Sequence, residues 1–154
     1  MSADEYHRAV PQLQHAASMD PTFFFAPYYL GLAYSLQGRY EAAIGEFRKA
    51  EQIEPNAQVA GQLGFLYGVT GRRNQAVARL RRLEARSQKD YVSPYLISLV
   101  HAGLDEQDLA LGWFARAIRE RSASLLWPGA KLISRHLRVG TRLARLLDAS
   151  GIPR

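Results

Sequence analysis

The 154-residue chain contains no cysteine, which excludes disulfide bonds, thiolate metal sites and a thiol nucleophile. It also lacks an apolar run that could span a bilayer, because its longest one, FFFAPYYLGLAYSL, has about 14 residues and includes a proline. The opening sequence MSADEYHRAV has no apolar stretch of the kind that a signal peptide carries. We therefore expect a cytoplasmic protein that does not enter a membrane.

Catalytic and nucleotide-binding signatures are also missing. There is no G-x-S-x-G, H-E-x-x-H, P-loop or dinucleotide-binding pattern, and the histidines fall in different predicted elements. Asp105, Glu106 and Asp108 cluster at a predicted turn, where they favour the start of the next helix rather than a calcium site. His101 is expected to be a packed residue with one hydrogen-bonded ring nitrogen. The sequence thus predicts no enzyme, no cofactor and no metal site.

The net charge of +6 is unevenly distributed. Residues 1–60 carry a net charge of −3, residues 61–115 one of +2 and residues 116–154 one of +7. A basic surface of this kind could bind nucleic acid or another polyanion. The candidate anion-binding residues are Arg79, Arg82, Arg86, Arg138 and Arg142. Nucleic acid is the less favoured partner, because the arginines between positions 72 and 86 point to several sides of one helix and no base-stacking motif accompanies them.

The most informative stretch is YYLGLAYSLQGRYEAAIGEFRKAEQIEP, residues 28–55. It predicts two amphipathic helices joined by a turn at Gly38, which can take the left-handed conformation that ends the first helix. Gly31 and Ala43 lack bulk, so the two helices can approach closely. Pro55 cannot continue the second helix. The defining positions are Leu30, Gly31, Tyr34, Ala43, Phe47 and Pro55, spaced L-G-x2-Y … A-x3-F … P.

This pattern recurs along the chain with a period of about 34 residues. The next unit repeats Leu30, Gly31, Tyr34, Gly38, Ala43 and Phe47 at Leu63, Gly64, Tyr67, Gly71, Ala76 and Leu80. A third unit repeats Ala76, Leu80 and Leu83 at Ala110, Phe114 and Ala117. Upstream, the matching positions of a lone second helix are Tyr6, Ala9, Leu13, Ala16 and Pro21. Several positions that recur at one period predict a helical repeat array.

The repeats divide the chain into a half repeat at 4–21, full repeats at 24–56, 57–90 and 91–124, and a C-terminal cap at 125–154. Helices are expected at 4–19, 26–36, 39–53, 56–69, 73–86 and 106–121, with a further one that begins at Pro94 after an N-cap at Ser93. Pro11 should kink the first helix or delay its start. The expected fold is an all-α, right-handed α-solenoid of antiparallel helix pairs, about 3.5 repeats long, with a C-terminal capping helix.

Over residues 4–121 the chain resembles a tetratricopeptide repeat domain. The runs YVSPYLISLVHAGL, ALGWF and IRERSASLLW, with a final LxxLL…GIP, are similar to bacterial repeat domains. Such domains lie C-terminal to signalling modules such as serine/threonine kinases and winged-helix transcription regulators, or stand alone. Their tail usually carries acidic and proline residues before the last helix, whereas the corresponding region here is basic. The resemblance implies a non-catalytic scaffold for protein–protein contacts.

In such arrays the first helix of each repeat lines a concave face. The spacing places an apolar, aromatic set on this face, namely Tyr28, Leu32, Ser35, Phe65, Tyr95 and Leu99, with Gly61 and Gly68 beside them. We expect it to bind a peptide or helix of a protein partner. Internal packing of the same residues, or a groove covered by the tail, is the competing interpretation.

The half repeat at the N-terminus suggests a further possibility. Either the chain is a segment of a longer protein, or the apolar side of this helix is covered by a second copy of the chain, which would give a homodimer with a self-occupied groove. Charges introduced at Val10 or Leu13 would then disrupt the dimer.

Overall fold

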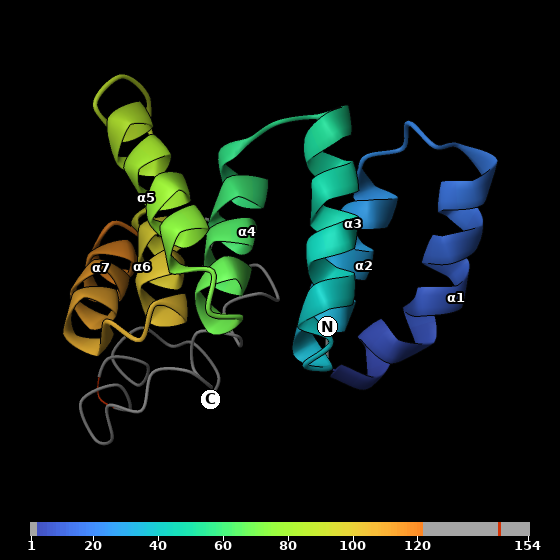
Figure 1. The fold of residues 1–154 in the computed structure, drawn as a ribbon, viewed down its shortest axis with the longest axis horizontal. Coiled ribbons are helices and arrows are strands. Elements are labelled where there is room, and N and C mark those ends of the chain that lie inside the picture. The colour runs from blue at the N-terminus through green and yellow to red at the C-terminus, as the bar shows by residue number, and fades with distance from the viewer. Residues whose placement is uncertain (1–2, 122–144, 146–154) are drawn as a thin grey trace.

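The computed structural model describes residues 3–121 and Arg145. Within this part the chain forms seven α-helices and no strand, as expected for an all-α fold (Figure 1). The helices are α1 (Ala3–Met19), α2 (Phe25–Leu36), α3 (Tyr40–Ile53), α4 (Ala57–Val69), α5 (Arg73–Ser87), α6 (Pro94–Gly103) and α7 (Gln107–Arg119). The predicted cap at 125–154, with Arg138 and Arg142, lies outside the described residues apart from Arg145.

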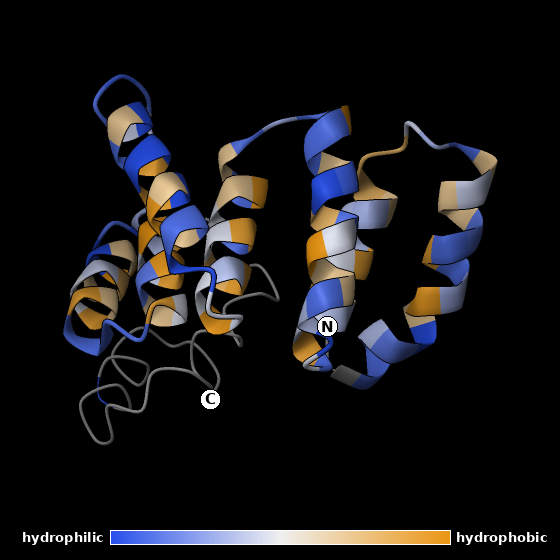
Figure 2. Cartoon of the chain, in the orientation of Figure 1, coloured by the Kyte–Doolittle hydropathy of each residue, from blue (hydrophilic) through white to orange (hydrophobic). Residues whose placement is uncertain are grey.

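Consecutive helices pack in pairs, α2 with α3, α4 with α5, and α6 with α7, while α1 packs against α2 at one end of the array (Figure 1). Every predicted helix in this part of the chain is present, with ends that differ by a residue or two. Ser93 caps α6 as expected, because its side chain accepts a hydrogen bond from the backbone N–H of Tyr95. The helices α1, α3, α5 and α7 carry both apolar and hydrophilic residues, as expected for amphipathic helices (Figure 2).

Glycines bring the helices into close contact. A Cβ placed on Gly31 would lie 2.7 Å from the Phe47 ring, which confirms the predicted close approach of α2 and α3. The approach is tighter still between the first helices α4 and α6. A Cβ on Gly68 would lie 2.4 Å from the backbone of Gly103, and one on Gly103 would lie 2.4 Å from the carbonyl oxygen of Phe65. Only glycine allows these backbones to meet.

The three first helices end in the same way. Gly38 and Gly71 take positive φ angles of 73° and 80°, as the sequence predicted for Gly38. Asp105 occupies the same place in the third repeat with a φ of 59°. Asp105 therefore closes α6. Helix α7 begins after its N-cap residue Glu106, which makes no side-chain cap hydrogen bond, and Asp108 lies in its first turn, so these two acidic residues are at the helix start as expected.

The second helices are linked by an ion pair. The guanidinium of Arg79 in α5 donates two hydrogen bonds to the Glu51 carboxylate of α3, one of them 3.0 Å long, and lies over the Tyr67 ring. The hydrogen bond from Arg79 lowers the pKa of Glu51. This pair joins successive repeats on the outer side of the array.

Helix α1 runs through Pro11 without a late start, and Figure 1 shows that it changes direction part-way along its length. Its apolar residues Val10 and Leu13 pack against the core. Most of its exposed positions are polar, among them Asp4, Arg8 and His15, whereas Pro11 and Met19 are exposed apolar residues. Substitutions at Val10 or Leu13 would therefore disturb folding, so they cannot test the predicted homodimer.

We predict that Gly68→Ala lowers the free energy of unfolding by about 1–3 kcal/mol, because the methyl group meets the backbone of α6. The matched control is Gly45→Ala in α3, where an added Cβ has no neighbour within 4 Å. It should raise stability by about 0.5–1 kcal/mol through helix propensity. Urea unfolding of both variants checks this, and equal effects would contradict the close packing of α4 on α6.

We also predict that Asp105→Gly raises stability by about 0.5–1 kcal/mol, because glycine adopts the left-handed conformation without the side-chain penalty. Asp108→Gly, in the first turn of α7, should instead lower stability. Thermal unfolding of the two variants provides the comparison. A loss of stability in Asp105→Gly would contradict this prediction, because the Asp105 side chain would then contribute more stability than its left-handed backbone conformation costs.

Candidate functional site

The side chains predicted to line the groove are buried. Their exposed fractions are Tyr28 2%, Leu32 1%, Ser35 2%, Phe65 0%, Tyr95 1% and Leu99 0%. They lie on α2, α4 and α6, as expected, and we call them the first-helix face. A partner could reach them only after the groups that cover them move, so their contact with a peptide stays a prediction.

Several of these residues are part of the core packing. Tyr28 stacks on Phe24 at 5.5 Å and meets the edge of Phe47 at 5.7 Å. Ser35 donates its hydroxyl proton to the backbone carbonyl of Gly31 at 2.8 Å. The expectation that Gly61 and Gly68 line the groove was wrong: they face α6, where Gly61 lies against Leu96. Their lack of side chains serves helix packing.

Tyr95 carries an unpaired polar group on the first-helix face. Its hydroxyl is fully buried and has no hydrogen-bond partner in the structure. Burial raises the pKa of Tyr95, and the neighbouring Tyr28 raises it further. Burial likewise raises the pKa of Tyr28. Both rings are therefore neutral at physiological pH, and the Tyr95 hydroxyl is a buried group that could donate or accept a hydrogen bond.

Three of the candidate anion-binding arginines, Arg79, Arg82 and Arg86, lie on α5. Arg79 is paired with Glu51 and partly buried, so its charge is balanced within the fold. Arg82 and Arg86 are exposed on α5. Arg138 and Arg142 lie outside the described residues. Binding of an anion by this set of arginines stays a prediction.

His101 is buried, as predicted, at the place that Tyr34 and Tyr67 occupy in the other repeats. The predicted hydrogen bond is absent at Nδ1, which lies 3.8 Å from Oε1 of Glu106. Burial lowers the pKa of His101, against the opposing effect of Glu106 and Glu84. Among the described residues, no group of histidine and acidic side chains could hold a metal ion.

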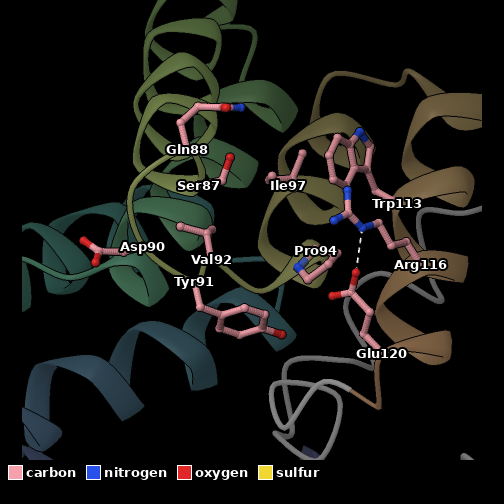
Figure 3. A pocket seen from close by; sticks show the side chains of 10 residues that line it. All are labelled: Ser87, Gln88, Asp90, Tyr91, Val92, Pro94, Ile97, Trp113, Arg116 and Glu120. Carbon is pink, nitrogen blue, oxygen red and sulfur yellow. Dashed lines mark hydrogen bonds and ion pairs between the residues drawn. The ribbon is translucent and has the colours of Figure 1, made fainter.

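A pocket of about 320 Å³ that the sequence did not predict lies between α5, α6 and α7. Trp113 and Arg116 form one wall, with the guanidinium 5.3 Å from the indole ring and an ion pair of 2.7 Å to Glu120 (Figure 3). Tyr91 lies at the rim and is 71% exposed. Trp113 takes the position that Arg79, which bridges the preceding repeats, holds one repeat earlier. The equivalent residue of the first full repeat is Glu46, so this position varies among the repeats and gave no signal for the pocket.

No helix in the described part of the chain is both long and apolar enough to cross a membrane. The feature of the described residues that indicates a class of protein is the repeated packing of short helix pairs.

Comparison with known proteins agrees with this architecture. A sequence model of the tetratricopeptide repeat family matches residues 28–57. The chain is 29% identical over 145 residues to superkiller complex protein 3 of Mus musculus, covering 82% of this chain and 9% of that protein. It is 27% identical over 132 residues to anaphase-promoting complex subunit 3 of Schizosaccharomyces pombe, covering 84% of this chain and 20% of that protein. The chain thus spans a small part of each relative.

The fold and the repeating contacts define an α-helical repeat protein. Residues 28–57 match the tetratricopeptide repeat, a family that typically mediates protein–protein interaction, and the other helix pairs pack in the same way. The expected kinship with bacterial signalling proteins stays a prediction.

We predict that the stability of the chain falls as the pH drops below about 6.5. Because the folded pKa of His101 is lowered, the unfolded chain takes up the proton first, and stability rises with pH in this range. His101→Tyr, which restores the residue of the other repeats, should lessen this dependence. Urea midpoints at several pH values check this, and parallel curves for the two proteins would contradict it.

Proposed function

We propose that the chain is a non-catalytic scaffold that binds a peptide or helix of a protein partner along the first-helix face. The observation that carries this proposal is the buried, unpaired hydroxyl of Tyr95 within a mostly apolar face. An unpaired buried hydroxyl costs stability in the free protein. A ligand that supplies the missing hydrogen bond would recover that cost.

The relatives support a role in assemblies, because their names describe a complex protein and a subunit of a complex. Burial of the first-helix face also supports a rearrangement of the chain on binding. Since Tyr28, Phe65 and Tyr95 are at most 2% exposed, binding requires a rearrangement, and association should be slower than for a preformed groove. No contact among the described arginines favours the polyanion-binding alternative.

The proposal can be tested by selecting random peptides displayed on phage against the immobilised full chain. Washes at about 0.5 M salt remove ligands held only by surface charge. We expect a family of related apolar peptides to survive. Failure to enrich any peptide, or loss of every binder in salt, would count against binding at the first-helix face.

A conservative variant then separates folding from binding. Tyr95→Phe removes only the unpaired hydroxyl, so the free chain should be as stable as before or about 1 kcal/mol more stable. The selected peptides should bind it about five- to tenfold more weakly, measured by fluorescence polarisation. Unchanged affinity would contradict a role for Tyr95 in recognition.

A further inference from the structure

Helix α2 is buried on all sides, although its described neighbours cover only part of it. All of its residues from Leu30 to Ser35 are buried. Consecutive residues of this number point in every direction around the helix axis, because one turn takes 3.6 residues. Among the described helices, however, α2 packs mainly against α1 and α3. Since two helices cannot enclose a third, another part of the protein covers the rest of α2.

The side of α2 that faces the next repeat lacks the close contact that joins α4 to α6. Three glycines of α4 meet α6 without room for a side chain, namely Gly61, Gly64 and Gly68. One repeat earlier, the equivalent residues of α2 are Tyr28, Gly31 and Ser35. A tyrosine at the position of Gly61 prevents the same approach of the backbones, and α2 makes little contact with α4.

The side chains that face this space between α2 and α4 are nevertheless buried. On α2, Tyr28 and Ser35 are each 2% exposed. On α4, Leu66 is in register with Val100, which in α6 packs against the preceding first helix, and Leu66 is 0% exposed. Because α2 and α4 do not pack closely on each other, burial of both sides requires that the space between them is filled.

The segment that follows α7 is the part of the chain that can fill this space. The structure contains one chain, and the connections between its described helices are short, the longest being residues 88–93. Residues 122–154 span about 110 Å when fully extended, so they can reach α2 from the end of α7. They also carry the apolar side chains that a cover needs, among them Leu125, Leu126, Trp127, Leu143, Leu146 and Leu147.

The charge of this segment also suits the position. Residues 122–154 contain six basic and one acidic side chain, which gives a net charge of +5, whereas residues 1–60 carry −3. The opposite charges draw the segment toward the half of the chain that contains α2. Helix α2 itself has no charged residue, so apolar side chains of the segment can lie against it.

We propose that the C-terminal segment, residues 122–154, covers the first-helix face and fills the space between α2 and α4. The chain thereby occupies its own binding face, and a partner binds by displacing the segment. This regulatory consequence rests on the proposed function, whereas the contact of the segment with α2 and α4 does not.

The first test measures how fast a single cysteine reacts with a thiol reagent in the full chain, which has no cysteine of its own. Ser35→Cys places the thiol on the side of α2 that faces α4. The matched control is Ser98→Cys, because Ser98 is 0% exposed and is covered by α7, where its hydroxyl donates a hydrogen bond to the carbonyl of Ala110. Both cysteines should react slowly in the chain with its natural C-terminal segment.

Each cysteine is then combined with charged substitutions in the segment, either Leu125→Glu with Leu126→Glu or Leu146→Glu with Leu147→Glu. At least one of these pairs should speed the labelling of Ser35→Cys about tenfold or more, while the labelling of Ser98→Cys changes less than about twofold. Unchanged labelling of Ser35→Cys with both pairs would overturn the proposal. An equal rise at both cysteines would show that the substitutions unfold the chain, and the second test then decides.

The second test leaves the C-terminal segment unaltered. Tyr28 is replaced by the photoreactive residue p-benzoylphenylalanine, and the peptides cross-linked to it on illumination are identified by mass spectrometry. We expect cross-links to residues 122–154 within one chain. Cross-links only to residues 3–121, or between two copies of the chain, would overturn the proposal. Neither test involves a partner, so both are independent of whether selected peptides bind.

Discussion

The close packing of the first helices α4 and α6 is the constraint on which the array depends. Their backbones meet at Gly68 and Gly103, and Gly64 leaves room for Val100 one turn earlier. This contact fixes the separation of two successive repeats. The second helices α5 and α7 then lie outside this pair, each attached to its own first helix.

The helix boundaries were predictable because each depends on short-range chemistry. Ser93 before Pro94 sets the start of α6, and Gly38 and Gly71 set the ends of α2 and α4. The positive φ of Asp105 was not predicted, since an aspartate before a helix also suits an N-terminal role. Asp105 lies one repeat after Gly71, and this register predicts its positive φ better than its residue type does.

The site was less predictable than the fold. Periodicity identifies the side of a helix on which a residue lies, but it does not show what covers that side. Tyr28, Phe65 and Tyr95 were placed on the correct helices, yet their burial depends on tertiary packing. The pairing of Arg79 with Glu51 joins residues on different helices, and no local pattern indicates it. The pocket beside Trp113 is lined by residues of α5, α6 and α7, and no local pattern indicates it.

A gradient of stability along the array follows from this packing, and native-state hydrogen exchange measures it directly. Amides of α4 and α6 should open together and only with global unfolding, because the two backbones share one interface. Amides of α1 should open at a lower free energy, because Ala9, Leu13 and Ala16 are only half-buried. If α4 and α6 opened separately, or α1 were as protected as they are, the α4–α6 interface could not be the centre of the fold.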